Sequence, residues 1–259
     1  MSRTLKLTVS YDGTGFVGWQ RQGEGVSVQG LLEDALARFE GGPVTVHGAG
    51  RTDAGVHALG QVASVDLTCS HTTEVLARGL NACLPPEVRV TDVQDAPSGF
   101  HARFSARSKT YRYVIRNAPV VSPFERAYVW HIPEPLDVAA MQVAAEALVG
   151  THDFSSFRST GSEIASAVRT IARSEVHRGA RGAAPLPPGP DDKTLLVYEV
   201  SANGFLRHMV RTIVGTLADV GRGRRTAASM TTLVAAGDRA HAGATAPPHG
   251  LFLVRVDYD

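Results

Sequence analysis

The first 93 residues alternate between strand-like and helix-like patterns, and this order constrains the fold more than any other feature of the sequence. Four segments alternate apolar and polar side chains as half-buried strands do: residues 5–10, 44–47, 61–66 and 88–93. Two segments place apolar side chains at helical spacing: residues 27–39, with Ser27 as N-cap, and residues 74–84. The order strand, helix, strand, strand, helix, strand predicts a ferredoxin-like α+β unit.

The rest of the chain repeats this alternation more loosely. Helices are expected at residues 138–149, 206–220 and 231–236, and strands at residues 110–115, 167–177, 195–200 and 251–256. We therefore predict an α+β fold of two halves, residues 1–105 and 106–259, whose sheets join across a cleft. A stretch rich in proline and glycine, residues 178–192, is expected to form a flexible hairpin extension.

Composition narrows the class of protein. The 259 residues suffice for a sizeable core, and 26 basic against 25 acidic residues leave a net charge of +1, so the whole chain is no polycation. Cys69 and Cys83 are the two cysteines and lack C-x-x-C spacing, which disfavours a disulfide scaffold or a thiolate metal site. Without a signal-peptide pattern or a long apolar run, we expect a cytoplasmic protein with no membrane partner.

A glycine-rich loop lies between two of the predicted strands. Gly48, Gly50 and Gly55 bracket Arg51 and Asp53, so the loop presents one guanidinium and one carboxylate. The simplest interpretation is a surface turn in which Asp53 bonds to its own backbone. The loop begins like G-x-G-x-x-G, but Asp53 stands where the third glycine belongs, and no Walker motif occurs in the sequence. We therefore expect no nucleotide cofactor.

A basic segment with interleaved aromatic residues follows the first half. Residues 99–116 contain no acidic residue and carry these side chains: Arg103, Arg107, Lys109, Arg112 and Arg116, with Phe100, Phe104, Tyr111 and Tyr113. Two interpretations stay open. In the first, the aromatic residues belong to the core and the charged residues form a solvated face. In the second, the segment binds unstacked nucleotides by pairing with phosphates and stacking on bases. On the second interpretation, this segment lines the cleft together with Arg207 and Arg211.

Six segments, in order along nearly the full chain, resemble the tRNA pseudouridine synthase A family. The first three are Tyr11-Asp12-Gly13 with Phe16, Gly18, Trp19 and Gln20; Arg51-Thr52-Asp53-Ala54-Gly55-Val56-His57-Ala58; and Phe100-His101-Ala102-Arg103-Phe104-Ser105-Ala106 with Tyr111-Arg112-Tyr113. The others are His152-Asp153-Phe154-Ser155-Ser156-Phe157-Arg158; Asn203-Gly204-Phe205-Leu206-Arg207-His208-Met209-Val210-Arg211; and Ala246-Pro247-Pro248-His249-Gly250-Leu251. Each segment alone is a weak signal, whereas the set is highly specific.

This resemblance implies the pseudouridine synthase fold, in which a mostly antiparallel sheet has helices on one side and a catalytic cleft between the halves. It implies isomerisation of uridine to pseudouridine in the anticodon stem-loop of tRNA, at the family positions 38, 39 and 40. It also implies a homodimer that works without cofactor or metal. The proline- and glycine-rich stretch looks like a peripheral lengthening of the family pattern.

The family match assigns roles to individual residues. Asp53 is the catalytic carboxylate, acting as nucleophile or stabilising an oxocarbenium-like centre, with C1′ and C6 both open as its target. Because burial disfavours a charged carboxylate, Asp53 needs a cationic partner, and by family match that partner is Arg211. Arg51 fills the space left by the flipped nucleotide, and Tyr111 stacks on the uracil and is a candidate for removing the C5 proton.

Three further basic residues, Arg158, Arg207 and His208, are either phosphate contacts or ordinary surface charges. Two other functions compete with the synthase. The first is a non-catalytic protein of the same fold that binds structured RNA through the basic-aromatic segment. The second is a metal-dependent hydrolase that uses Asp53 with His47 and His57, although no known ligand spacing matches these residues.

Overall fold

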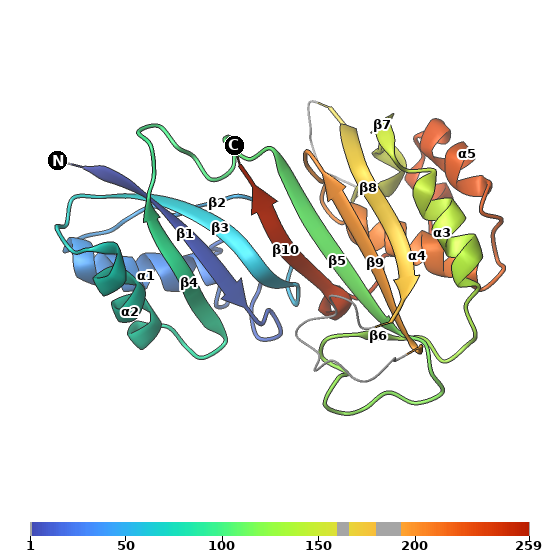
Figure 1. Cartoon of the computed structure of the whole chain (residues 1–259), viewed down its shortest axis with the longest axis horizontal. Coiled ribbons are helices and arrows are strands. Elements are labelled where there is room, and N and C mark those ends of the chain that lie inside the picture. The colour runs from blue at the N-terminus through green and yellow to red at the C-terminus, as the bar shows by residue number, and fades with distance from the viewer. Residues whose placement is uncertain (1, 160–165, 180–192, 259) are drawn as a thin grey trace. The chain divides into compact units, whose positions relative to one another are not determined.

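The computed structural model describes residues 2–159, 166–179 and 193–258, and the chain divides into two compact units (Figure 1). Unit 1 comprises Met1–Lys109 with Phe252–Asp259, and unit 2 comprises Thr110–Leu251. The predicted halves, residues 1–105 and 106–259, differ from this division in the place of the C-terminal strand. That strand belongs to unit 1 because it pairs with a strand of the first half.

Unit 1 has the predicted order of strands and helices. Its elements are β1 (Arg3–Tyr11), α1 (Val28–Glu40), β2 (His47–Gly48), β3 (His57–Leu67), α2 (Thr73–Cys83), β4 (Val88–Asp95) and β10 (Leu251–Asp257). Strand β1 lies between β4 and β3 and is antiparallel to both, while β2 pairs antiparallel with β3. This is the ferredoxin-like arrangement expected from the sequence. Strand β10 adds to β3 in parallel, with Phe252 opposite His57.

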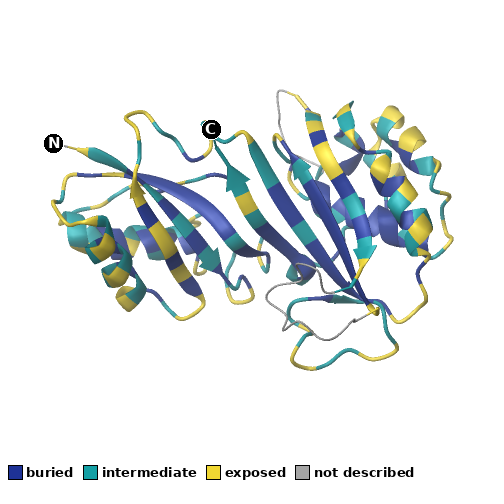
Figure 2. Cartoon of the chain, viewed as in Figure 1, coloured by how far each residue is buried: buried dark blue, intermediate teal, exposed yellow. Residues whose placement is uncertain are grey.

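Local signals in the sequence set the helix ends of unit 1. The side chain of Ser27 accepts a hydrogen bond from the N–H of Gly30 at the start of α1, and Gly41 ends the helix with φ of 79°. The side chain of Thr72 caps α2 in the same way. Strand β3 begins at His57, four residues before the expected start, because it is buried almost throughout and so lacks polar alternation (Figure 2).

Unit 2 contains further strands and, among its described residues, three α-helices. Its elements are β5 (Ser108–Arg116), β6 (Trp130–His131), α3 (Val138–Glu146), β7 (Gly150–Asp153), β8 (Val168–Arg178), β9 (Leu195–Ala202), α4 (Met209–Gly221) and α5 (Ser229–Ala236), with 3₁₀ turns at Ser155–Phe157, Arg239–His241 and Pro248–Gly250. The strand order is β5-β9-β8-β7. The antiparallel pairing of β8 with β9 confirms the predicted strand pair.

Unit 2 has two short strands that were not predicted, β6 and β7, which lie at the margins of the sheet. Two expected helix bounds are also corrected. The helix expected at residues 138–149 ends at Glu146, and Gly150 begins β7 instead of ending that helix. The helix expected from residue 206 begins at Met209. Most of the predicted hairpin extension, residues 180–192, lies outside the described residues.

The strand pairs within the two units are mostly antiparallel, as predicted; β10 with β3 and β5 with β6 are parallel. Helices α1 and α2 lie side by side in unit 1, where the Phe39 ring fills the space beside Gly79. In unit 2, α3 packs against both β8 and α4. Within the described part of the chain, no helix is both long and apolar enough to cross a membrane.

Candidate active site

The glycine-rich loop of unit 1, residues 48–57, is held by the segment that follows β1. Asp53 forms an isolated antiparallel bridge with Gly18, and the N–H of Trp19 donates to the carbonyl oxygen of Thr52 at 3.1 Å. Gly18 has φ of 113°, and a Cβ atom there would lie 2.6 Å from the same Thr52 oxygen. Only glycine therefore permits this approach of the two backbones. The backbone at Thr52 and Asp53 is therefore held by the segment that contains Gly18 and Trp19.

A buried pair of hydroxyl groups involves Thr52, the residue before Asp53. The phenol oxygen of Tyr11 is 2.8 Å from Oγ1 of Thr52, and both side chains are buried. Burial raises the pKa of the Tyr11 phenol to about 12, although its hydrogen bonds to Thr52 and Gln61 act in the opposite direction. The phenol therefore stays neutral near pH 7 and acts as a fixed hydrogen-bonding support for the loop.

Gly13 closes the other end of the loop. A Cβ atom on Gly13 would lie 2.0 Å from the carbonyl oxygen of Val56, a distance that no side chain tolerates. The N–H of Gly13 donates to Nδ1 of His57 at 3.0 Å, and the His57 ring stacks on Phe252 with centroids 4.7 Å apart. Two turns from separate parts of the sequence thus pack backbone to backbone around the loop.

These contacts account for the two histidines that flank the loop. His57 is 2% exposed and packs as described above, while His47 stacks on His101 with centroids 4.7 Å apart. Among the residues that the structure describes, no group of three or more His, Cys, Asp or Glu side chains is placed to hold a metal ion. The packing of each ring explains both histidines without the metal-ligand role considered from the sequence.

Within the loop, neighbouring side chains have different environments. Arg51 is exposed, Thr52 is buried and Asp53 is partly buried. The carbonyl of Gly50 accepts a hydrogen bond of 2.9 Å from Nε2 of Gln61, which holds the backbone just before Arg51. Arg51 is thus an exposed cation on a fixed backbone, beside a carboxylate whose backbone is also fixed.

Unit 2 holds the predicted stacking residue in a packed position. Tyr111, on β5, is 7% exposed and meets the ring of Phe205 edge to face, with centroids 5.0 Å apart. Tyr113, on the same strand, donates from its hydroxyl to the carbonyl of Pro247 at 2.8 Å. Both tyrosines are therefore packed, as the structural interpretation of the basic-aromatic segment expected.

Arg211 is held by two hydrogen bonds to Ala246, in the segment Ala246–Leu251 that carries part of the family resemblance. Its Nε donates to the carbonyl of Ala246 at 2.8 Å, and the N–H of Ala246 donates to the carbonyl of Arg211 at 3.0 Å. The positive charge of Arg211 also lowers the pKa values of two nearby side chains, although burial has the larger effect on both. The pKa of His249 is lowered, mainly by burial and further by Arg211, and the pKa of Tyr113 is raised by burial while Arg211 opposes that rise. Arg211 is thus a positioned charge at the start of α4.

Three further basic residues meet just before α4. The N–H of Ser159 donates to the carbonyl of Arg207 at 3.0 Å, which brings Arg158 and Arg207 into adjacent segments. His208 has φ of 62° and is the one non-glycine residue with positive φ among those described. Such a conformation costs about 1 kcal/mol and is often found at functional sites. Arg207 and His208 precede the helix, a correction to the expectation that the helix contains them.

The basic segment at residues 99–116 is only partly available for binding. Nη2 of Arg112 lies 2.6 Å from Oε2 of Glu199, and Nη2 of Arg116 lies 2.7 Å from Oε1 of Glu125. Arg116 is buried. The expectation that the whole segment offers cations to a ligand is therefore wrong for these two residues. They were misassigned because their carboxylate partners come from outside the segment.

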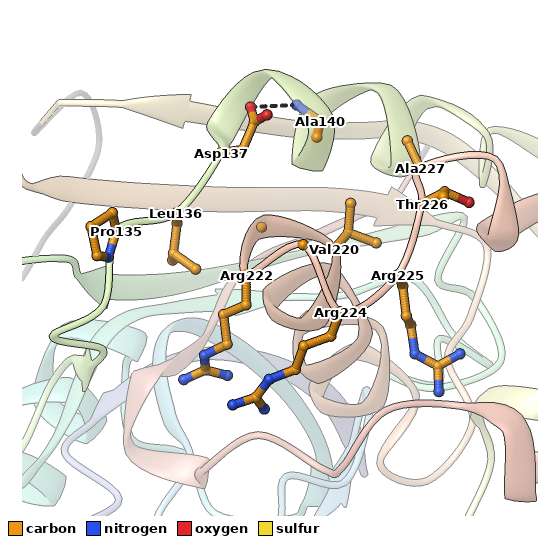
Figure 3. Close-up of a pocket in the computed structure, with 12 residues that line it drawn as sticks. Pro135, Leu136, Asp137, Ala140, Val220, Arg222, Arg224, Arg225, Thr226 and Ala227 are labelled. Carbon is orange, nitrogen blue, oxygen red and sulfur yellow. Dashed lines mark hydrogen bonds between the residues drawn. The ribbon is translucent and has the colours of Figure 1, made fainter.

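A cavity in unit 2 is lined by none of the predicted site residues. It measures about 700 Å³ and lies between the residues that precede α3 and the segment that follows α4 (Figure 3). Arg222, Arg224 and Arg225 project from that segment. Glu134 lies 3.5 Å from Arg222, and Asp219 lies 3.6 and 3.8 Å from Arg224 and Arg225. This cavity was not expected from the sequence.

Comparison with known proteins gives the family. A family model described as "tRNA pseudouridine synthase" matches residues 7–105 and 144–259. Proteins named tRNA pseudouridine synthase A are 42% identical in Geotalea uraniireducens (99% of this chain, 100% of that protein), 46% in Solidesulfovibrio magneticus (98% and 90%) and 46% in Afipia carboxidovorans (98% and 98%). The chain therefore belongs to the tRNA pseudouridine synthase family, as its motifs suggested.

The structure also identifies supporting residues that the sequence did not single out. Tyr11 and Gly13 lie behind the Asp53 loop, while Phe205 and Ala246 hold Tyr111 and Arg211. All four stand inside segments that carry the family resemblance. Their presence in those segments was the available signal, but their contacts depend on tertiary structure and could not be assigned from spacing.

Proposed function

We propose that this protein isomerises uridine to pseudouridine in tRNA, with Asp53 as the catalytic carboxylate. The observation that carries the proposal is the fixation of Asp53: its bridge to Gly18 and the hydrogen bond from Trp19 to Thr52 hold the loop backbone in place. A preorganised carboxylate is what a reaction needs when a charged or covalent intermediate must be held in one geometry. Similarity to tRNA pseudouridine synthases over the full chain supports the same reaction.

The reaction requires three changes of bonding. The N1–C1′ glycosidic bond breaks, the uracil turns, and C5 bonds to C1′ while any bond to the enzyme carboxylate is released. The C5 proton then leaves to restore the aromatic ring and N1 takes up a proton, so the product is an isomer of the substrate. Asp53 as nucleophile holds the fragment between the first and third steps, by an ester bond to C1′ or by addition to C6. Both targets use the same carboxylate, so both are compatible with the position of Asp53 on its loop.

Other residues supply charge, stacking and space. We propose that Arg211 provides the positive charge that keeps Asp53 ionised, since its guanidinium is fixed by Ala246. Tyr111 supplies the aromatic face for the uracil, and its edge contact with Phe205 holds the ring in place. Arg51, exposed on the rigid loop, occupies the space that the flipped nucleotide leaves. Arg158, Arg207 and His208 contact phosphates of the RNA backbone.

The substrate is proposed to be the anticodon stem-loop, at positions 38, 39 and 40, and the enzyme a cytoplasmic homodimer that needs no cofactor. These points follow from the family resemblance. The test is release of tritium from unmodified tRNA labelled at uridine C5. We expect release from tRNA with uridine at these positions and none when they are replaced by cytidine. Release that is unchanged by the replacement would overturn the site assignment.

The competing proposal is a non-catalytic protein that binds structured RNA. The same assay separates the two, because a binding protein retains labelled tRNA without releasing tritium. A gel-shift measurement on the same samples reports binding independently of turnover. Binding without release by the native chain would establish the alternative.

A further inference from the structure

An exposed aromatic ring lies on the surface of unit 1 next to the catalytic loop. Phe104 is 76% exposed and belongs to the turn formed by residues 100–105. The ring of His101 lies 4.3 Å from it, centroid to centroid, and the guanidinium carbon of Arg103 lies 5.6 Å from its centroid. His101 in turn stacks on His47. We call these four residues, His47, His101, Arg103 and Phe104, the aromatic platform.

The platform is rigid although its outer ring is exposed. Nδ1 of His101 accepts the N–H groups of Arg103 at 3.1 Å and of Phe104 at 3.4 Å. Two further bonds tie the ends of the turn together: His101 N–H to Ser105 Oγ at 3.1 Å, and Ser105 N–H to His101 O at 2.9 Å. Because the turn is already ordered, a ligand that binds Phe104 loses little free energy in ordering it.

Two hydrogen bonds join this turn to the sheet of unit 1. The N–H of Ala102 donates to Oγ of Ser64 on β3 at 3.0 Å, and the hydroxyl of Tyr258 donates to the carbonyl of Ala102 at 2.7 Å. His47 belongs to β2, which pairs with β3 and continues directly into Gly48 of the catalytic loop. The platform and the catalytic loop are thus parts of one rigid body.

The chemistry of the platform matches a nucleotide. Phe104 offers an exposed aromatic ring, and Arg103 is an exposed cation with no carboxylate at ion-pair distance among the described residues. Bases stack on such rings whatever their identity, and arginine contributes both phosphate pairing and cation–π contact. A broad apolar area, as a protein partner requires, is not present here: Arg103 and Arg107 on the same segment are exposed and charged.

We propose that an unpaired nucleotide of the bound tRNA, other than the one that is isomerised, stacks on Phe104 with its phosphate on Arg103. The proposal rests on the proposed function, because it assigns a second nucleotide of the same substrate. The isomerised base is assigned to Tyr111 and Asp53, so the platform holds a neighbouring nucleotide of the loop and positions the RNA. Phe104 is accordingly a positioning residue.

The experiment compares Phe104→Ala, Phe104→Trp and Arg103→Gln in the full chain. Stacking on one ring is worth enough that Phe104→Ala should raise Kd and KM for unmodified tRNA about tenfold, with the single-turnover rate at saturation unchanged. Phe104→Trp should restore binding, and its indole fluorescence should be quenched by the RNA. The matched control is Phe124→Ala, since Phe124 is 88% exposed in unit 2 and belongs to no platform.

The outcomes are distinguishable. If the native chain releases tritium and Phe104→Ala binds tRNA as the native chain does, the platform is wrong while the proposed function stands. If the native chain neither binds nor isomerises tRNA, the proposed function itself fails. Sedimentation of the same variants tests a protein contact. If Phe104→Ala dissociates an oligomer and retains its affinity for RNA, then Phe104 contacts a second copy of this chain and the nucleotide proposal is wrong.

Discussion

The phenol oxygen of Tyr11 lies 2.8 Å from Oγ1 of Thr52, and Thr52 immediately precedes Asp53 in the catalytic loop. Both side chains are buried, so this hydrogen bond joins the end of β1 to the loop in a place that water does not reach. An aspartate on a glycine-rich loop is held in one geometry only if the residues beside it are fixed. This pair is one of the contacts that fix them.

We predict that Tyr11→Phe lowers the free energy of unfolding by about 1–2 kcal/mol, because it leaves the buried Thr52 hydroxyl without this partner. Urea unfolding of the native chain and the variant measures the difference. Tyr11→Phe keeps the ring and removes only the oxygen. Because the ring packing is unchanged, the difference in stability reports the hydrogen bond. A variant as stable as the native chain would show that the hydrogen bond contributes nothing.

We also predict that the free energy of unfolding depends on pH in the alkaline range through Tyr11. The Tyr11 phenol ionises near pH 10 in the unfolded chain, whereas burial raises its pKa to about 12 in the folded chain. The unfolded state therefore loses its proton first, and stability is complete below pH 10 and falls between pH 10 and 12. In Tyr11→Phe this fall should be smaller by about 1.4 kcal/mol per pH unit. Parallel curves for the two proteins would contradict the assignment.

Two glycines two residues apart give a matched test of the loop support. Gly13→Ala places a Cβ atom 2.0 Å from the carbonyl oxygen of Val56, while a Cβ at Gly15 meets nothing within 4 Å. We expect Gly13→Ala to displace the Asp53 loop and reduce kcat about 100-fold, the usual cost of a 1 Å misplacement, whereas Gly15→Ala keeps native activity. Equal activity of the two variants would show that the loop tolerates movement.

Glu199 is the buried centre of an ion-pair network in unit 2. Its Oε2 lies 2.6 Å from Nη2 of Arg112, and its Oε1 lies 2.8 Å from Nη1 of Arg173. Glu199→Ala removes the carboxylate that pairs with Arg112 in a mostly buried position and should cost about 3 kcal/mol of stability. Glu175→Ala, which removes only an exposed pair with Arg173, should cost less than about 1 kcal/mol. The chemical denaturation curves should rank the two variants in that order; the reverse order would be inconsistent with the network.

Salt dependence tests the proposed phosphate contacts of Arg158 and Arg207. Each contact that is lost should weaken tRNA binding and reduce the slope of log K against log salt concentration by about 1. Arg158→Ala and Arg207→Ala should each show this change. Arg21→Ala is the charge-matched control, because Arg21 is already paired with Glu33 and Asp34. A slope that stays native in the two test variants would make both residues ordinary surface charges.

The sequence predicted the fold well where local signals decide the structure. Ser27 and Gly41 mark the ends of α1 by their own chemistry, and the alternation of β1 follows from one buried face. The hydrophobic pattern did not predict the strand bounds correctly where a residue is buried by segments that are distant in the sequence. Strand β3 is buried on nearly every residue, so its first residues carry no alternation, and β7 is too short and polar to be recognised.

The site was predictable in part. Asp53 and Arg51 could be proposed because a glycine-rich loop with opposite charges is visible in the sequence and resembles a known motif. The pairing of Arg112 with Glu199 depends on the adjacency of β5 and β9, which spacing does not give. The left-handed conformation of His208 could not be assigned either: histidine adopts positive φ more often than most residues, but this backbone is uncommon for every residue except glycine.

The most direct test of the account is a single-turnover measurement of tritium release from C5-labelled tRNA by the native chain and by Asp53→Asn. The asparagine keeps the size of the side chain and one acceptor oxygen, and it removes the nucleophilic charge. We predict that both proteins bind unmodified tRNA with the same affinity and that the native chain alone releases tritium. Equal release by both proteins would show that Asp53 takes no part in the chemistry and would contradict its role as the catalytic carboxylate.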